Sequence, residues 1–144
     1  MFHEALSRPG NRLVTGCRPV FLGRLEKFID GQIVLMTVSD IETITFSLFR
    51  QNADTQSEYS RFVGTTPIED WQNILVDKTK VITALTMYDQ EYYSVLGLEP
   101  FEANFHYSPD NNPVLFERPG VYEARFRCEA QDQVYPGTVQ IIVR

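Results

Sequence analysis

The chain has 144 residues, of which 43% are hydrophobic and 12% aromatic, and its formal net charge is −6. This length and apolar content indicate one globular domain and exclude a disordered chain, and no apolar run approaches the ~20 residues of a membrane-spanning helix. Because binding to duplex DNA depends on cationic contacts to phosphates, the acidic balance also argues against sequence-specific nucleic-acid binding.

The N-terminus is predicted to be an extended arm, residues 1–16, ahead of a single domain over residues 17–144. Its first eleven residues lack the apolar segment of a secretory signal, so folding in the cytosol is expected. Residues 1–27 carry a net charge of +3, and the remaining chain therefore carries −9. Such a basic segment could contact a neighbouring copy or another acidic surface, or it could simply fray in solvent.

The domain opens with strand-like sequence over residues 17–29, which Pro19 and Gly23 interrupt. Such interruptions favour an edge strand or a β-bulge. Asp30-Gly31 is a hairpin turn pair that tolerates positive φ. The return strand is expected over residues 32–38.

The next segments combine a turn, a strand and a helix. Ser39-Asp40-Ile41-Glu42 resembles a helix capping box, but the alternation that follows favours a tight turn and then a strand to about Arg50. Residues 51–59 are expected to form a polar loop. Thr66-Pro67-Ile68-Glu69 combines a cap, a proline and an acid at helix-start spacing, which predicts a short helix to about Leu75.

Later strands are predicted over residues 80–87, 101–107 and 114–116, and Tyr92 to Leu98 is a further candidate strand between the first two. The turn-forming cluster Ser108 to Pro113 separates the last two of these strands.

The last 25 residues contain the clearest pattern in the chain. From Val121 to Ala130, apolar and charged residues alternate strictly, as in a half-buried strand. Pro136-Gly137 is expected to break the chain before a final strand, in which Val139, Ile141 and Val143 share one face.

Eight or nine short strands and one short helix predict an all-β fold, an antiparallel β-sandwich of Ig-like or jelly-roll-like type. Cys17 and Cys128 are expected to be buried free thiols, because a cytosolic protein rarely holds a disulfide.

Residues that could carry chemistry are scattered. Neither His3 nor His106 has a nucleophile or an orienting partner at useful spacing. The acidic groups Glu69-Asp70, Asp89 with Glu91 and Glu99 with Glu102 are ordinary for an acidic protein. Asp110-Asn111-Asn112 favours a turn over a calcium loop. No enzyme activity, metal or cofactor is therefore expected.

The aromatic residues are better candidates for a functional surface than the histidines and acidic residues. Trp71 is expected in the core. The neighbours Tyr92 and Tyr93 would point to opposite faces of a strand, so one of them should be exposed and available to a partner.

One resemblance refines this interpretation. Pro119-Gly120-Val121-Tyr122, the alternation after it and the closing strand to Arg144 resemble the last two strands of Ig-like domains in bacteria and phages. Asp30-Gly31, the stretch from Val38 to Phe46, and Asp70-Trp71 are similar to small β-sandwich proteins of tailed phages. The resemblance covers about half the chain and implies a structural role in a baseplate, tail or head-decoration module.

The expected function is therefore that of a non-enzymatic virion structural protein, a capsid decoration or neck/tail component assembled in the host cytoplasm. It would bind itself, as a homo-oligomer, and other virion proteins, but no membrane. The predicted partner-binding residues are Phe2, Leu6, Arg8, Arg12, Tyr92 and Tyr93. Two alternatives remain: a carbohydrate- or ligand-binding module with an exposed aromatic platform, and a small β-sandwich enzyme that uses two close carboxylates.

Overall fold

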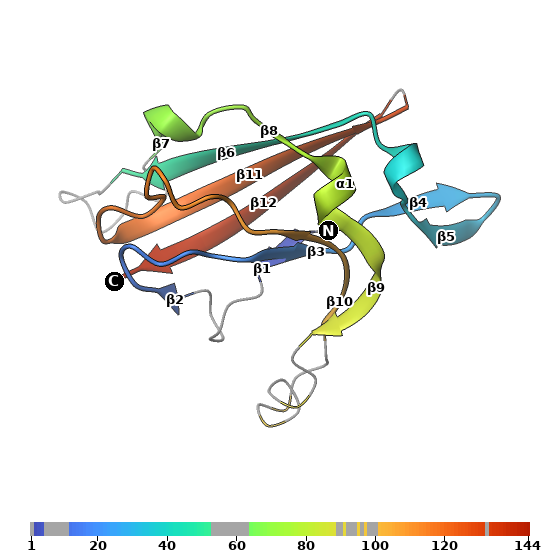
Figure 1. The fold of residues 1–144 in the computed structure, drawn as a ribbon, viewed down its shortest axis with the longest axis horizontal. Coiled ribbons are helices and arrows are strands. Elements are labelled where there is room, and N and C mark those ends of the chain that lie inside the picture. Colours follow the sequence, from blue (N-terminus) through green and yellow to red (C-terminus); the bar gives the residue numbers. More distant parts are fainter. Residues whose placement is uncertain are drawn as a thin grey trace.

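The computed structural model describes residues 2–4, 12–52, 64–88, 91, 95, 97, 101–131 and 133–144. These residues form an all-β protein with two mainly antiparallel sheets on either side of a shared core (Figure 1). The element α1 (Lys78–Val81) is a short α-helix. The predicted fold class, an antiparallel sandwich with one short helix, is confirmed.

The large sheet has six strands. Five of them lie in the order β2 (Arg12–Leu13), β12 (Gln133–Val143), β11 (Gly120–Ala130), β6 (Thr43–Gln51) and β7 (Thr65–Pro67). The sixth, β8 (Ile74–Val76), also pairs with β6. The small sheet has four, in the order β1 (Phe2–Glu4), β3 (Phe21–Gly23), β10 (Phe101–Tyr107) and β9 (Ile82–Tyr88). A separate hairpin joins β4 (Glu26–Ile29) to β5 (Gln32–Leu35). Two single-turn 3₁₀ helices complete the described elements: η1 (Val38–Asp40) and η2 (Glu69–Trp71).

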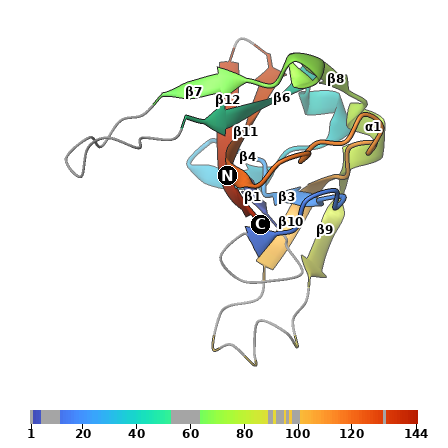
Figure 2. The ribbon, with the colours of Figure 1, turned by 90° about the vertical axis from the view of Figure 1, so that its left-hand side faces the viewer.

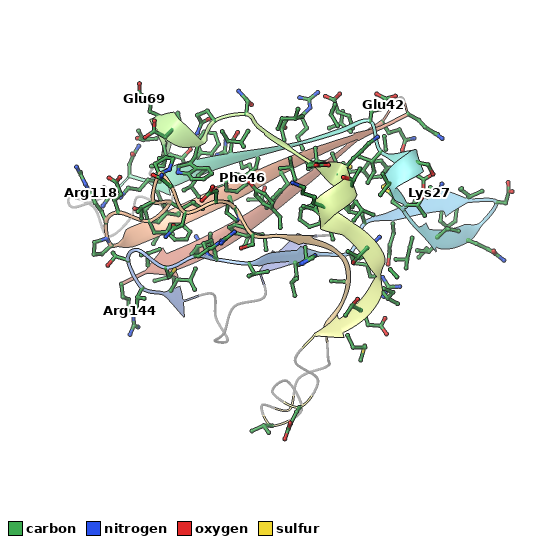
Figure 3. All side chains as sticks on the ribbon, in the orientation of Figure 1. Lys27, Glu42, Phe46, Glu69, Arg118 and Arg144 are labelled. Carbon is green, nitrogen blue, oxygen red and sulfur yellow. The ribbon has the colours of Figure 1, made fainter. Side chains whose placement is uncertain are left out.

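The core lies between the two sheets and is built largely of aromatic rings. The ring centroids of Phe46 and Phe126 in the large sheet lie 5.2 Å apart with the rings tilted, and the centroid of Phe21 from the small sheet lies 5.4 Å from that of Phe126. Phe105 adds an edge-on contact to Phe126 at 5.4 Å. Each fully buried ring contributes up to about 3 kcal/mol, so this cluster is the main force that holds the sheets together. Figure 3 shows Phe46 between the layers.

The alternation predicted near the C-terminus is confirmed. In β11, every second residue from Tyr122 to Ala130 is buried, while the residues between them face outward. The outward face carries the ion pairs Arg125–Glu123 at 2.6 Å and Arg127–Glu129 at 3.0 Å. Val139, Ile141 and Val143 also share the buried face, as predicted.

The predicted break at Pro136-Gly137 is wrong. β12 runs through both residues, which pair with Arg127 and Phe126 of β11, and the turn falls earlier, beginning at Gln131. Proline is tolerated there because β2 pairs only with Ile142 and Val143, which leaves the other side of β12 at Pro136 without a described partner strand.

The helix predicted from Thr66 is also wrong. Thr66 and Pro67 are extended and pair with Arg50 and Phe49 in β6, so tertiary pairing overrides the local helix signal. Only η2 follows, with Trp71 buried as expected and Leu75 71% exposed.

The α-helix begins instead at Lys78, where a strand was predicted from residue 80 onward. The Asp77 side chain caps it by accepting a hydrogen bond from the Thr79 backbone N–H at 3.0 Å. The strand itself, β9, starts two residues later than predicted, at Ile82.

Three smaller expectations need correction. Residues 114–116 form no strand, although Leu115 and Phe116 are buried. β3 is not an edge strand, because it lies between β1 and β10. The described residues contain twelve strands rather than eight or nine, since several pairings involve only two to four residues.

Candidate interaction surface

The hairpin β4–β5 has the geometry that its sequence predicts. Asp30 and Gly31 adopt φ values of 50° and 80°, the positive angles of a two-residue turn. The register places Phe28 opposite Ile33 and Lys27 opposite Val34. The hairpin projects from one end of the molecule beyond the two sheets (Figure 1).

Apolar side chains are exposed on both faces of this hairpin. Phe28 is 72% exposed and Ile33 66%, and the two form a cross-strand pair on one face. On the opposite face Ile29 is 44% exposed and Val34 40%. A hairpin with one face in water normally alternates apolar and polar residues, whereas continuous apolar sequence is typical of strands covered on both faces. The turn end of this hairpin therefore carries two consecutive apolar residues in each strand, and the described chain leaves them largely exposed.

A buried amide fixes the base of the hairpin to the small sheet. Asn104 in β10 is 1% exposed and sits at the register shift between Ala103 and Phe105. Its Oδ1 accepts from the Leu25 N–H at 2.7 Å, and its Nδ2 donates to the carbonyls of Leu25 and Met36 at 3.0 and 3.1 Å. These bonds satisfy backbone groups just before β4 and just after β5, so the hairpin leaves the body in a defined direction.

Ion pairs reinforce the same junction. Lys27 pairs with Asp40 of η1, beside the hairpin base (Figure 3). The bond from Lys27, together with one from the Thr37 N–H at 2.8 Å, holds the pKa of Asp40 below its ordinary value. Arg24 bonds Glu26 and also reaches Glu102 at 2.7 Å. Two cations of the basic N-terminal region are therefore used inside the domain.

A groove separates the hairpin from the start of β12. It has a volume of about 490 Å³ and is lined by Glu26, Lys27, Phe28, Ile33, Gln133 and Tyr135. The Phe28 ring and Tyr135 give it apolar walls, while the remaining polar groups supply hydrogen-bonding capacity.

The outer strand edges differ in how they are protected. In the large sheet, the outer strand β7 ends in Pro67, and the open part of β12 contains Pro136. Proline has no N–H to donate, so it blunts an edge against further pairing. Figure 2 shows β7 and β9 at opposite outer margins of the molecule.

Among the described outer strands, β9 of the small sheet lacks this protection, and so does β8 of the large sheet, which pairs only with β6 and has the sequence Ile74-Leu75-Val76. β9 contains neither proline nor charge, and no described strand pairs with its outer side. Leu85 is 42% exposed and Met87 44%. Within β9 the Ala84 carbonyl accepts from the Thr83 and Thr86 hydroxyls, each at 3.1 Å.

The residues considered for chemistry do not assemble into a site. Among the described residues, no group of three His, Cys, Asp or Glu side chains could hold a metal ion. Asn111 donates from Nδ2 to the Gly16 carbonyl at 3.1 Å, so the 108–113 turn packs against the start of the domain. Asp89 and Glu99 lie outside the described residues.

Both cysteines are free thiols, as predicted, although Cys17 is only half-buried. Burial raises the pKa of Cys128 to about 11, with a further contribution from the neighbouring Glu129 carboxylate. Such a thiol is unreactive near neutral pH.

The predicted partner-binding residues fall mostly outside the described chain, namely Leu6, Arg8, Tyr92 and Tyr93. For Phe2 and Arg12 only the backbone is described: Phe2 pairs with Gly23, and Arg12 with Ile142. Residues 2–4 and 12–13 of the predicted arm therefore lie along the two sheets of their own domain.

Sequence reasoning missed the hairpin as a surface. The available signal was the two apolar pairs that flank Asp30-Gly31 without alternation, Phe28 with Ile29 and Ile33 with Val34.

No family model matches the chain, and searches of curated proteins and of solved structures return no significant match. The choice between an Ig-like and a jelly-roll-like sandwich therefore stays a prediction. The described residues include no helix long and apolar enough to span a bilayer.

Proposed function

We propose that this chain is a structural protein of a virion, a capsid decoration protein or a neck or tail component, that acts through contacts with itself and with other virion proteins. The observation that carries the proposal is the β4–β5 hairpin, with Phe28 and Ile33 exposed on one face and Ile29 and Val34 on the other. An anchored element that exposes apolar side chains on both faces suits a surface that a partner covers.

The rest of the molecule suits a passive building block. A tightly packed aromatic core supports the surface, while Asn104 and the Lys27–Asp40 pair hold the hairpin in place. Small contacts repeated by symmetry give a tight assembly even when each one is weak. In this proposal the protein works in the virion after assembly in the host cytoplasm and needs no cofactor. Phe2, Leu6, Arg8, Arg12, Tyr92 and Tyr93 remain predicted contacts to neighbours.

Co-assembly tests this proposal. The purified chain is mixed with candidate head and tail proteins of tailed phages, and complexes are measured by multi-angle light scattering. We expect a complex of defined mass with at least one of them, and weaker complex formation by Phe28→Ser. A chain that binds neither itself nor any of these proteins would contradict a structural role.

The groove beside the hairpin favours a second candidate, a carbohydrate-binding module. Phe28 and Tyr135 offer rings on which a sugar could stack, and Glu26 and Gln133 offer polar partners. A glycan array decides this case: binding that is lost in Tyr135→Ala would support it, and the absence of any hit would remove it.

A further inference from the structure

A small pocket lies at the end of the sandwich opposite the β4–β5 hairpin. Its volume is about 190 Å³, and its walls come from the end of β6, from η2 and the residue before it, from β11, and from residues 114–118 between β10 and β11. Figure 3 shows Glu69 of η2 and Arg118 at one end of the molecule and Lys27 at the other. The pocket is therefore separate from the groove beside the hairpin.

The Trp71 indole belongs to the wall of this pocket and lacks a hydrogen-bond acceptor among the described residues. The side chain is 5% exposed, and its Nε1 is buried without a partner. The rest of the residue is fixed: its main-chain N–H donates to the Ile68 carbonyl at 2.9 Å, and its ring packs edge-on against Phe46 at 6.0 Å. Buried indole N–H groups normally have a partner, because burial removes the hydrogen bond that water would accept. A ligand that brings an acceptor into the pocket would satisfy this donor.

Two arginine side chains also line the pocket. Arg50 donates from Nη2 to the Pro119 carbonyl at 3.0 Å, which uses one of the five N–H groups of the guanidinium. A Cβ atom at Gly120 would lie 3.1 Å from the Arg50 Nε, so the glycine leaves the space that this side chain occupies. The Arg118 carbonyl accepts from the Tyr122 hydroxyl at 2.7 Å, which holds the main chain beside the second guanidinium. Guanidinium groups bind carboxylates through two parallel N–H···O bonds, so both arginines suit a carboxylate ligand.

Two carboxylates, Asp70 and Glu117, line the same pocket. None of the ion pairs found among the described residues involves these carboxylates or the two arginines. Two positive and two negative side chains give the lining a formal charge of zero. A simple anion would be attracted by one pair and repelled by the other, whereas a ligand that carries both charges meets an opposite charge on each side.

The remaining walls are apolar, and the space between them is small. Ile68, Val114 and Leu115 contribute aliphatic side chains. The volume lies below the roughly 300–1,000 Å³ that is typical of sites for drug-sized ligands. The walls therefore suit a compact ligand with a carboxylate, an ammonium group and an aliphatic group.

We infer that this pocket binds a free amino acid with an aliphatic side chain, such as leucine. The two arginines hold the carboxylate of the ligand, which also accepts from the Trp71 indole N–H. The ammonium group contacts the two carboxylates of the lining, and the aliphatic side chain packs against the apolar walls. This site goes beyond the proposed function and does not depend on it, because it lies away from the hairpin.

The indole of Trp71 provides a direct readout of binding. It is the only tryptophan in the chain, so a proton–nitrogen correlation NMR spectrum contains a single indole N–H signal. Leucine should shift this signal saturably, with a Kd of about 1 mM or lower. Isocaproate lacks the ammonium group of leucine, and isoamylamine lacks its carboxylate. Each analogue should bind at least roughly tenfold more weakly, because one pair of charged side chains then has no partner on the ligand.

Two pairs of variants relate the shift to the pocket. Arg118→Gln and Glu117→Gln each remove one exposed charge from the lining and should weaken leucine binding roughly tenfold. Arg127→Gln and Glu42→Gln are the matched controls and should bind leucine like the wild type. Arg127 lies on the outer face of the large sheet, and Glu42 lies at the hairpin end of the molecule (Figure 3). Circular dichroism and the unfolding midpoint verify that all four variants fold.

Three results would overturn the inference: an indole signal that leucine does not shift, an analogue that binds as tightly as leucine, or pocket variants that bind leucine like their controls. Inorganic phosphate is the last probe, and tighter binding of phosphate than of leucine would also contradict an amino-acid site. None of these outcomes changes the result of co-assembly with virion proteins, so the two proposals fail separately.

Discussion

The large sheet and the β4–β5 hairpin are made from the same strand-forming residues, but they use them differently. In β11 the side chains alternate between a buried face and a charged face, and the two faces match the core and the solvent. In the hairpin, neighbouring residues such as Phe28 and Ile29 are both apolar and both exposed. Both regions therefore have high strand propensity. They differ in whether another part of the same chain covers their apolar side chains.

The same contrast holds for the strand edges. Proline lies in β7 and β12 of the large sheet, while β9 and β5 have no such residue. The large sheet thus has proline at two of its edges, whereas the hairpin and β9 have none and expose apolar side chains. Substitutions in the two regions should consequently affect different measurements.

The largest expected effect separates the core from the hairpin. Phe126→Ala removes a ring that contacts Phe21, Phe46 and Phe105, and should lower the free energy of unfolding by about 3–5 kcal/mol. Phe28→Ala should change it by less than about 0.5 kcal/mol, because that ring is 72% exposed. Urea unfolding measures both. Equal losses would mean that the hairpin is part of the core.

The next effect concerns the junction between the two regions. Asn104→Ala leaves the Leu25 N–H and the carbonyls of Leu25 and Met36 without their side-chain partner, and should cost about 2–3 kcal/mol. Hydrogen exchange should become faster in residues 26–35 than in β11. If exchange rises equally in both, Asn104 supports the whole sandwich rather than the hairpin.

A smaller effect depends on pH. Because the folded-state pKa of Asp40 lies below its ordinary value of 3.8, its contribution to stability is present above that value and is lost as the pH falls through the folded-state pKa. Asp40→Asn should therefore cost up to about 1 kcal/mol near neutral pH and almost nothing in strong acid. Urea unfolding of both proteins near neutral pH and in strong acid measures this difference in stability.

Asp30→Asn is the matched control for that experiment, since Asp30 lies at the exposed hairpin tip. At neutral pH it should change stability by less than about 0.5 kcal/mol. An Asp40→Asn deficit that persists unchanged in acid would show that the carboxylate charge is not what stabilises the junction.

The smallest expected effect concerns the reactivity of the two thiols and leaves stability unchanged. Burial raises the pKa of both, that of Cys128 to about 11, but only Cys17 is partly open to solvent. Iodoacetamide at mildly alkaline pH should label Cys17 slowly and should label Cys128 only once the protein unfolds. Mass spectrometry of the labelled peptides, with Cys17→Ser as the control, measures this. Labelling of Cys128 in the folded protein would show that the large sheet opens locally.

Much of the fold could be predicted from local patterns. The alternation from Val121 to Ala130, the Asp30-Gly31 turn and the strand over residues 101–107 all agree with the structure. Of the candidate surface, only the turn could be predicted, because a local sequence pattern does not show which apolar strand residues stay uncovered in the fold. The hairpin emerged once the exposure of Phe28 and Ile33 was known.

The sequence by itself determined which segments are extended and which faces of β11 and β12 are apolar, because both follow from the steric preferences of adjacent residues. Only the tertiary structure decided that Pro136 lies within a strand, that Thr66 and Pro67 pair with β6, and that Asn104 holds Leu25 and Met36. Those outcomes depend on which distant segment becomes the neighbour. The neighbouring segment determines whether Pro136 can lie in a strand, whether Thr66 stays extended, and whether the Asn104 amide is hydrogen-bonded.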